Sequence, residues 1–152
     1  MPEFVSVEKL KQMIGEDNGT SDWITVDQDK INQFADATGD HQWIHVDIEM
    51  AKKGPFGGPI AHGFLTLSLI PVFSAMGKYM PEGITMAVNY GLNKVRFINP
   101  VPAGSKIRSK QVISNVEEKS GNRLQMIVTH TIEIEGQEKP ACIAEMITMF
   151  FF

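Results

Sequence analysis

The most regular pattern in the chain is an alternation of apolar and polar residues over positions 123–135. Almost every even-numbered position of this stretch is apolar, and most odd-numbered positions are polar or charged. The even-numbered side chains are Leu124, Met126, Val128, His130, Ile132 and Ile134. Successive side chains of a β-strand point to opposite faces of a sheet. The pattern therefore predicts a strand with one buried face and one face in water.

Three further stretches in the second half of the chain have the composition of strands. They are rich in Val, Ile, Thr and Phe and cover Ile84–Ile98, Ser105–Glu117 and Lys139–Phe152. Short polar turns, such as those around Gly121 and Gly136, separate strand-like stretches from one another. Long strands joined by short turns predict one antiparallel sheet.

The first half of the chain has mostly helical patterns. Apolar residues at helical spacing over Val5–Ile14 predict a short helix that is closed by Gly15, and Trp23–Val26 predicts a short strand. Asp27 has the character of an N-cap, and Gly39 is expected to end the helix that follows it. The predicted apolar face of that helix is Ile31, Phe34, Ala35 and Ala37.

The middle of the chain is its most apolar part. A short helical segment around Asp47–Lys53 is followed by Gly54–Pro59, a loop with three glycines and two prolines. Nearly every position from His62 to about Met80 is apolar, so we expect one long helix with protein on all sides, bent at Pro71. A curved antiparallel sheet with this helix along its concave face buries both elements, which is an α+β layout.

Composition and charge narrow the classes of partner. No repeat or linker divides residues 1–152, so we expect a single domain. The net charge of −4, made of −8 from residues 1–49 and +4 from residues 50–152, is atypical of a nucleic-acid-binding protein. The one cysteine, Cys142, forms no intrachain disulfide, which favours a reducing compartment. No secretory signal pattern and no membrane-spanning apolar run are present. We therefore expect a cytoplasmic protein, although an organelle stays open as its location. We expect neither a nucleic-acid partner nor a membrane partner.

Three of the four histidines are close together in the sequence. His41, His45 and His62 lie within 22 residues, next to Asp40. His41 and His45 are four residues apart, a spacing that on a helix places two metal ligands on one face. Gln42 replaces the glutamate of a metalloprotease site, and the preceding glycine predicts a loop, so we expect no metal here. The alternative to a functional site is that these are surface or capping histidines.

Two segments around these histidines resemble the hydratase motif of the MaoC-like family, the (R)-specific enoyl-CoA hydratases. The first is FADATGDHQWIH over residues 34–45, and the second is GGPIAHG over residues 57–63. The stretch NYGLNKVRF over residues 89–97 is similar to the strand that follows in that family. The resemblance extends from about residue 23 to the C-terminus. Gln42-Trp43 replaces the Asn-Pro of the best-characterised members, which resembles the NodN-like branch.

The resemblance implies both a fold and a reaction. The fold is the hotdog fold, in which a curved antiparallel β-sheet wraps around a long central α-helix, usually as a homodimer. The reaction is that of a hydro-lyase, which adds water to trans-2-enoyl-CoA to give (R)-3-hydroxyacyl-CoA or runs the reverse dehydration. Asp40 and His45 match the family's catalytic pair and would hold one water between them, with the choice of base left open. No cofactor is implied, because coenzyme A is part of the substrate.

The start of the predicted central helix is the candidate site for the thioester oxygen. Negative charge builds on this oxygen during the reaction, and a fixed N–H donor stabilises it. The backbone N–H of Gly63 is the candidate donor, with Ala61 and His62 beside it. His62 is either a hydrogen-bond partner that shapes this turn or a purely structural histidine.

A basic segment lies between Glu82 and Glu117, where five basic residues and no acidic residue occur. These residues are Lys94, Arg96, Lys106, Arg108 and Lys110. Lys106, Arg108 and Lys110 alternate and therefore share one strand face. Lys94, Arg96, Lys106 and Arg108 are candidates to bind the phosphates of coenzyme A. The alternative is a solvated sheet face with no ligand.

Two other functions stay open at this level. One is a hotdog-type acyl-CoA thioesterase, and the other is a non-catalytic acyl-CoA-binding module, for which the replacement at Gln42-Trp43 would be the sign. The sequence does not determine the acyl chain length or the choice between coenzyme A and acyl-carrier-protein thioesters.

Overall fold

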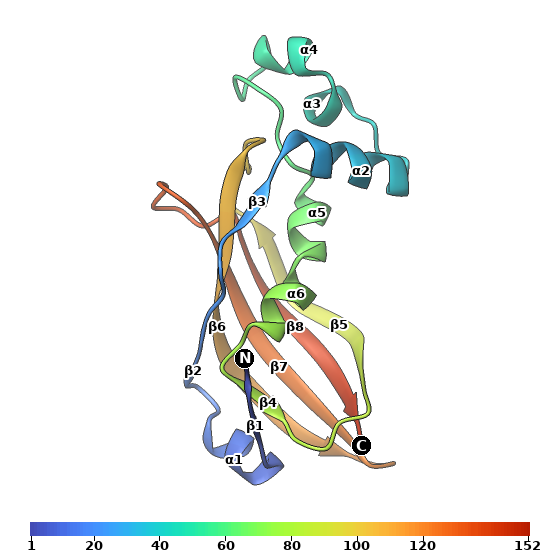
Figure 1. Cartoon of the computed structure of the whole chain (residues 1–152), viewed down its shortest axis with the longest axis vertical. Helices are drawn as coiled ribbons and strands as arrows, with labels where there is room; N and C mark the ends of the chain where they lie inside the picture. Colours follow the sequence, from blue (N-terminus) through green and yellow to red (C-terminus); the bar gives the residue numbers. More distant parts are fainter.

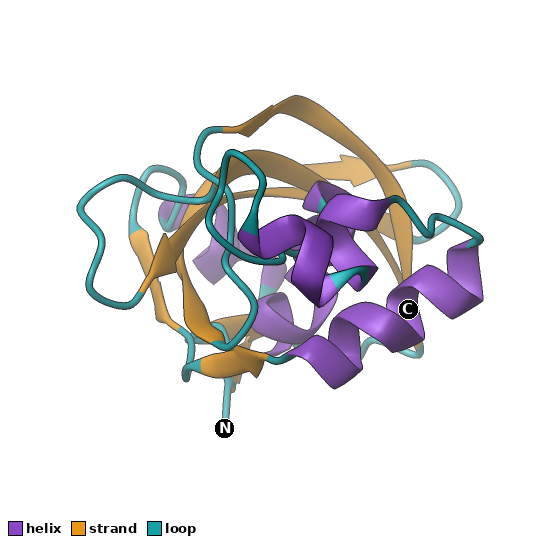
Figure 2. Ribbon diagram, turned by 90° about the horizontal axis from the view of Figure 1, so that it is seen from above, coloured by secondary structure: helices purple, strands orange, loops and turns teal.

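A strongly curved antiparallel sheet forms the body of the molecule in a computed structural model that describes residues 1–152 (Figure 1). The strand order is β2-β6-β7-β8-β5, and β3 also pairs with β6. The view from above shows the strands curving around helical segments (Figure 2). The strands are β2 (Asp17–Thr20), β3 (Ile24–Val26), β5 (Met86–Phe97), β6 (Ser105–Lys119), β7 (Arg123–Ile134) and β8 (Cys142–Phe151). The α+β class predicted from the sequence is confirmed.

The alternation that marks β7 in the sequence corresponds to its place at the centre of the sheet. β7 lies between β6 and β8. Every even-numbered residue of β7 is buried, and the residues between them are half-buried. The C-terminal part of this face, Ile132 and Ile134, packs in one hydrophobic core with Ile70 and Phe73, and its N-terminal part belongs to a second cluster. The predicted two-faced strand is therefore confirmed.

The central helix consists of two short helices in succession. α5 (Gly63–Ser68) and α6 (Ile70–Ala75) meet at Leu69, so the prediction of one long helix to about Met80 is wrong. Pro71 lies in the first turn of α6, where the missing N–H removes no intrahelical hydrogen bond. The proline therefore marks the start of a second helix instead of bending a continuous one.

One side of α5 and α6 is uncovered within a single chain. Leu65, Ile70 and Phe73 are buried against the sheet, whereas Phe64 is 68% exposed and Val72 is 42% exposed. The expectation that protein surrounds this helix on all sides is thus wrong for one chain. An exposed apolar face of this kind marks an interaction surface or a ligand groove.

The long N-terminal helix, α2 (Gln28–Thr38), has the predicted ends. The side chain of Asp27 accepts a backbone hydrogen bond in the first turn, and Gly39 ends the helix with a left-handed φ of 84°. Ala37, which the sequence places on the apolar face, is exposed. The buried stripe is therefore narrower than predicted, because only Ile31 and Ala35 of α2 are buried.

The remaining helices are short. α1 (Val7–Gln12) and α4 (Ile48–Lys52) correspond to predicted segments, although α1 ends before Ile14. α3 (Trp43–Val46) is a helical turn in residues predicted to be a loop, which is a correction. No helix in the molecule has the length and apolarity that crossing a membrane requires.

Three strands were not predicted, namely β2 at one edge of the sheet and two short strands that pair with each other. β1 (Glu3–Val5) and β4 (Tyr79–Pro81) form a separate parallel pair. They contribute Val5 and Tyr79 to a second hydrophobic cluster, which also contains residues of β6, β7 and β8. This small layer covers the end of the sheet that is remote from α2 (Figure 1).

Candidate active site

Three polar side chains from separate elements meet at the start of α5. Asp40 follows the end of α2, His45 lies in α3, and His62 directly precedes α5. One polar atom from each of them lies within 4.8 Å of the others. His45 is 6% exposed and His62 is 2% exposed, whereas Asp40 is exposed. The cluster therefore combines two buried imidazoles with a carboxylate that solvent and ligands can reach.

Asp40 is held in a tight turn after α2. Its backbone N–H donates to Oγ1 of Thr38 at 3.4 Å, and its Oδ1 accepts from the backbone N–H of Gln42 at 3.3 Å. Gly39 supplies the left-handed conformation that turns the chain here. Oδ2 makes no hydrogen bond within the chain, so this oxygen is available to a ligand.

His45 is fixed in one tautomer. Its Nδ1 lies 2.7 Å from the carbonyl oxygen of Ile60. Because a carbonyl only accepts, Nδ1 carries the proton, and Nε2 of the neutral ring has a free lone pair. Burial lowers the pKa of His45, and the neighbouring His62 lowers it further, against the opposite effect of the Ile60 carbonyl. His45 is therefore neutral at pH 7 and able to accept a proton at Nε2.

Gln28 supports His45 from the first turn of α2. Its Nε2 donates to the backbone carbonyl of His45 at 2.8 Å. Sequence reasoning missed Gln28, because its partner is 17 residues away and no motif links the two positions.

His62 contacts both of the other members of the cluster. Its Nε2 lies 2.9 Å from the carbonyl oxygen of Asp40, so this nitrogen carries the proton. Its ring stacks on that of His45, with centroids 3.8 Å apart and planes at 23°. The edge-to-face partner of His62 is Phe34, with a centroid distance of 4.9 Å. Nδ1 of His62 is buried and has no hydrogen-bond partner.

The arrangement of the two rings does not fit a metal ion. A metal binds an imidazole nitrogen along its in-plane lone pair at about 2.0–2.1 Å. The rings of His45 and His62 are stacked 3.8 Å apart with planes only 23° from parallel, so their lone pairs do not converge at that distance. His41, which the sequence spacing pairs with His45, instead contacts Asp36 at 3.0 Å and is exposed.

The first turn of α5 presents free backbone donors, one of which is Gly63. The N–H of Gly63 makes no hydrogen bond within the chain. A Cβ at Gly63 would lie 3.2 Å from the ring of Phe97, so any larger residue would press against this ring. Ala61 differs, because its N–H donates to the carbonyl of Val101 at 2.8 Å and its side chain is buried. Ala61 therefore offers no free donor to a ligand.

The basic residues predicted to bind phosphates lie on two different surfaces. Lys106 and Arg108 alternate with buried residues of β6 and so lie on the outer face of the sheet, where Arg108 pairs with Glu133 at 2.8 Å. Lys94 and Arg96 lie on β5 and form no ion pair. Lys94 has a left-handed φ of 47° at an irregularity in the pairing of β5 with β8.

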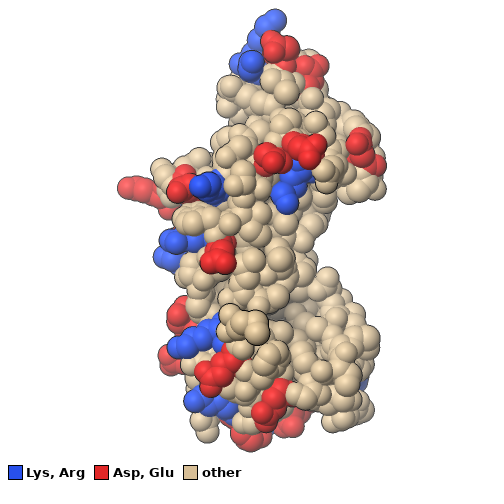
Figure 3. Space-filling model, in the orientation of Figure 1, with Lys and Arg blue, Asp and Glu red and all other residues tan.

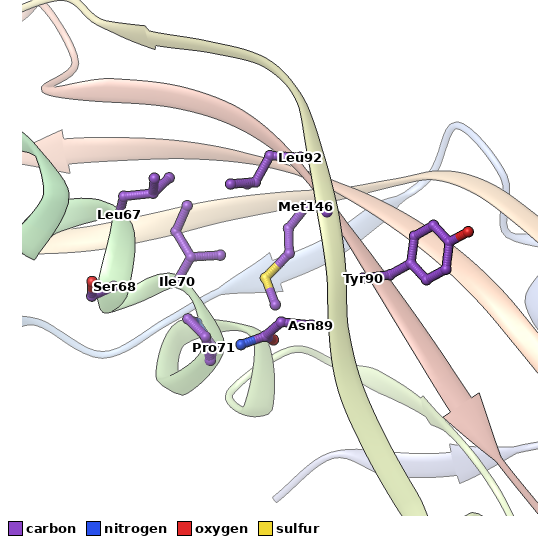
Figure 4. Close-up of a pocket in the computed structure, with 9 residues that line it drawn as sticks. Leu67, Ser68, Ile70, Pro71, Asn89, Tyr90, Leu92 and Met146 are labelled. Atoms are coloured by element: carbon purple, nitrogen blue, oxygen red, sulfur yellow. The ribbon is translucent and has the colours of Figure 1, made fainter.

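A groove of about 330 Å³ lies between the central helices and β5 (Figure 4). Its lining includes Leu67, Ser68, Ile70, Pro71, Asn89, Leu92 and Met146. The side chain of Asn89 points toward Pro71, whereas the ring of Tyr90 points away from the helices (Figure 4). An adjoining cavity of about 310 Å³ shares Pro71, Asn89 and Met146 with the groove. The groove was not predicted from the sequence, because its residues come from four separate elements.

Comparison with known proteins places this geometry in a family. The family described as MaoC like domain matches residues 9–136. The 3-hydroxyacyl-thioester dehydratase Z of Mycobacterium tuberculosis is 51% identical over 150 residues, which are 99% of each chain. Nodulation protein N of Rhizobium meliloti is 46% identical over 151 residues, covering 97% of this chain and 92% of that protein. The structure of R-hydratase PhaJ1 from Pseudomonas aeruginosa shares the fold with a TM-score of 0.69 and 22% identity, over 91% of this chain and 81% of that chain.

The match to the family covers most of the chain, and both relatives align over nearly the whole of it. The resemblance recognised from the sequence, including that to the NodN-like branch, is thereby confirmed. The curved sheet around central helices is the hotdog arrangement of these proteins. The chain belongs to the MaoC-like dehydratase family and is a hydro-lyase with the hotdog fold.

Proposed function

We propose that the protein is an (R)-specific enoyl-CoA hydratase, which interconverts a trans-2-enoyl-CoA plus water and the (R)-3-hydroxyacyl-CoA, with Asp40 and His45 as the catalytic pair. The observation that carries this proposal is the tautomer of His45. Its Nδ1 is committed to the carbonyl of Ile60, so the unprotonated Nε2 is left for the reaction, with the carboxylate of Asp40 in the same cluster. The name of the relative from Mycobacterium tuberculosis, a 3-hydroxyacyl-thioester dehydratase, supports the reaction class.

Asp40 and His45 have different roles toward one water molecule. In hydration, Nε2 of His45 takes a proton from the water as the oxygen forms a bond to C3, and the π electrons of C2=C3 move toward the thioester. The carboxylate of Asp40 accepts a hydrogen bond from the second hydrogen of this water and fixes its direction. The proton held on His45 then passes to C2, so that H and OH have been added and the enzyme is unchanged.

The thioester oxygen gains negative charge when C2 becomes enolate-like. The free N–H of Gly63 is the proposed donor to this oxygen. The groove between α5, α6 and β5 begins four residues after Gly63, and most of its lining residues are apolar. We assign the groove to the acyl chain, because an apolar chain that leaves the thioester along α5 enters it directly.

The phosphates of coenzyme A need cations that are free to pair with them. Lys94 and Arg96 have no acidic partner, whereas Arg108 is already paired with Glu133. Lys94, Arg96 and Lys106, which also forms no ion pair, are therefore stronger candidates than Arg108. The reaction needs no cofactor other than coenzyme A as part of the substrate.

A homodimer joined through β5 is the proposed assembly. β5 is the last strand of the sheet, so one edge of it is unpaired. Its exposed side chains include Met86, Val88 and Tyr90, with exposures of 50%, 42% and 63%. Figure 3 shows few charged residues on the side where β5 lies. Apolar side chains on an unpaired edge favour a second copy of the chain as the covering partner.

The test follows the loss of enoyl-thioester absorbance with purified protein. We expect turnover by the wild type, a loss of about a hundredfold or more in Asp40→Asn and in His45→Ala, and an unchanged rate in the matched control His41→Ala. Dialysis against a strong chelator is expected to leave the rate unchanged. Full rates in both variants of the pair would show the assignment to be wrong. Release of free thiol from a saturated acyl-CoA would instead indicate a thioesterase, and binding without turnover would indicate a non-catalytic module.

A further inference from the structure

His62 touches both members of the proposed pair, although the mechanism gives it no chemical step. Its Nε2–H donates to the backbone carbonyl of Asp40 at 2.9 Å, and its ring stacks on that of His45 with centroids 3.8 Å apart. We propose that His62 is a positioning residue that fixes the carboxylate of Asp40 and Nε2 of His45 relative to one another. This inference rests on the proposed hydratase function.

The hydrogen bond from His62 is the one that joins Asp40 to a distant part of the chain. The other two hydrogen bonds of Asp40, to Thr38 and Gln42, are 3.4 Å and 3.3 Å long and stay within the local turn. The bond from His62 is shorter, at 2.9 Å, and spans 22 residues. Because Asp40 is exposed, its turn would otherwise be free to move relative to the buried His45.

The contact with His45 restricts a different movement. The hydrogen bond from Nδ1 of His45 to Ile60 fixes one edge of the ring at 2.7 Å, but a single bond allows the ring to tilt about it. The face of His62 lies against the face of His45 and blocks that tilt. Phe34 contacts His62 edge-to-face, with 4.9 Å between the ring centroids, and limits the movement of the His62 ring. The direction of Nε2 of His45 therefore depends on the ring of His62.

Two substitutions separate the two contacts. His62→Phe keeps an aromatic ring against His45 and removes the donor to Asp40. The same change loses no bond at Nδ1, because this buried nitrogen has no partner. His62→Gln keeps an amide N–H for the carbonyl of Asp40 and removes the ring stack. His41→Phe and His41→Gln are the matched controls, since His41 is exposed and lies outside the cluster.

We expect kcat for enoyl-CoA hydration to fall about tenfold to a hundredfold in each His62 variant, with KM changed by less than about threefold, because a displaced catalytic group lowers the rate more than binding. The His41 variants should keep the wild-type kcat. Full kcat in either folded His62 variant overturns the claim that His62 positions both residues. Thermal unfolding of each variant shows whether the protein assayed is folded.

Double variants separate positioning from a general structural role. If His62 acts through Asp40, His62→Phe adds no further loss to the residual rate of Asp40→Asn, and His62→Gln adds none to that of His45→Ala. A purely structural role would multiply the losses in both backgrounds and would overturn the proposal. Failure of the proposed function has a different signature, namely a wild type without hydratase turnover or an Asp40→Asn variant with an unchanged rate.

Discussion

Two backbone carbonyl groups determine which nitrogens of the histidine pair carry protons. The carbonyl of Ile60 accepts from Nδ1 of His45, and the carbonyl of Asp40 accepts from Nε2 of His62. A hydroxyl group or a water molecule can donate or accept, so as a partner it would allow either tautomer of the histidine. A carbonyl only accepts, so the nitrogen that faces it carries the proton. At the scale of single residues, the chemistry of the site therefore follows from where the turn after α2 and the loop before α5 place their peptide groups.

The first prediction concerns the pH dependence of the proposed reaction. His45 must be neutral to act as a base, and burial lowers its pKa from the ordinary value of 6.5. Activity should therefore persist below that value and disappear only as the pH falls through the lowered pKa. The measurement is kcat/KM against pH with an enoyl-pantetheine substrate, which has no phosphates that titrate in this range. An acidic midpoint at or above 6.5 would contradict the assigned role.

The second prediction concerns His130, which is fully buried on the inner face of β7. Its Nδ1 lies 2.8 Å from Oγ of Ser109, and burial lowers its pKa from 6.5 to about 4. Between these two values the unfolded chain binds a proton that the folded chain excludes, so the free energy of unfolding falls as the solution is acidified. The difference between the two pKa values corresponds to a decrease of about 3 kcal/mol in the free energy of unfolding once the pH is below 4.

Urea unfolding from pH 7.5 to pH 4.5 measures this effect. The wild type should lose more stability over that range than His130→Phe, which cannot titrate at this position. The comparison uses the difference between the two slopes, because other groups titrate equally in both proteins. Equal slopes would mean that His130 is already protonated in the folded state or is not buried in solution.

The sequence revealed some members of the site and not others for a physical reason. Asp40 and His45 are recognisable because their chemistry requires fixed residue types at a fixed spacing along one loop. The stack of His62 on His45 depends instead on how α3 and the loop before α5 approach one another in space. The hydrogen bond from Gln28 likewise depends on the contact between α2 and α3. Such contacts leave no periodic or motif signal in the chain.

Among the structural elements, α3 contacts the chain that follows α4 through the indole of Trp43. A Cβ at Gly54 would lie 3.0 Å and 3.1 Å from ring atoms of Trp43, so the indole packs directly on the backbone after α4. Trp43 stands where the best-characterised family members have proline. The tryptophan therefore changes how the loop that carries His45 is packed, while the Asp40 and His45 cluster is retained.

The third prediction follows from this contact. Gly54→Ala places a methyl group against the indole and should lower the free energy of unfolding by about 1–2 kcal/mol, as overpacking does elsewhere. Gly58→Ala is the matched control, because a Cβ there meets nothing within 4 Å and its φ is not left-handed. Thermal or urea unfolding of both variants gives the comparison. Equal stability of the two would show that Trp43 is free to move away from Gly54.

The elements themselves were predictable to different degrees. β7 was clear from its alternation, because one face is buried and the other meets water. The central helix was predicted as one element, because apolar composition does not show that Leu69 ends one helix and begins the next. β1 and β4 are three residues each and parallel, so their pairing depends on contacts between distant segments. Short elements of this kind have no pattern long enough to detect.

For the whole molecule, charged residues of both signs are unevenly distributed over the surface. Figure 3 shows charged residues spread along much of one side of the molecule and few on the side of β5. Several exposed large apolar side chains lie on that side, with Phe64 and Val72 on α5 and α6 and Met86, Val88 and Tyr90 on β5, the last strand of the sheet. Other exposed apolar side chains, such as Phe4 and Ile48, lie elsewhere, so the proposed dimer contact would cover a part of the exposed apolar surface.

The fourth prediction tests that contact. Lysine in place of Val88 or Tyr90 puts a charge on the unpaired strand edge, which opposes pairing with a second copy. We expect Tyr90→Lys and Val88→Lys to sediment as monomers at micromolar concentrations at which the wild type sediments as a dimer. Val112→Lys is the matched control, because Val112 is also apolar and 38% exposed but lies on β6, inside the sheet. A wild type that is monomeric, or β5 variants that remain dimeric, would mean that the apolar edge has another partner.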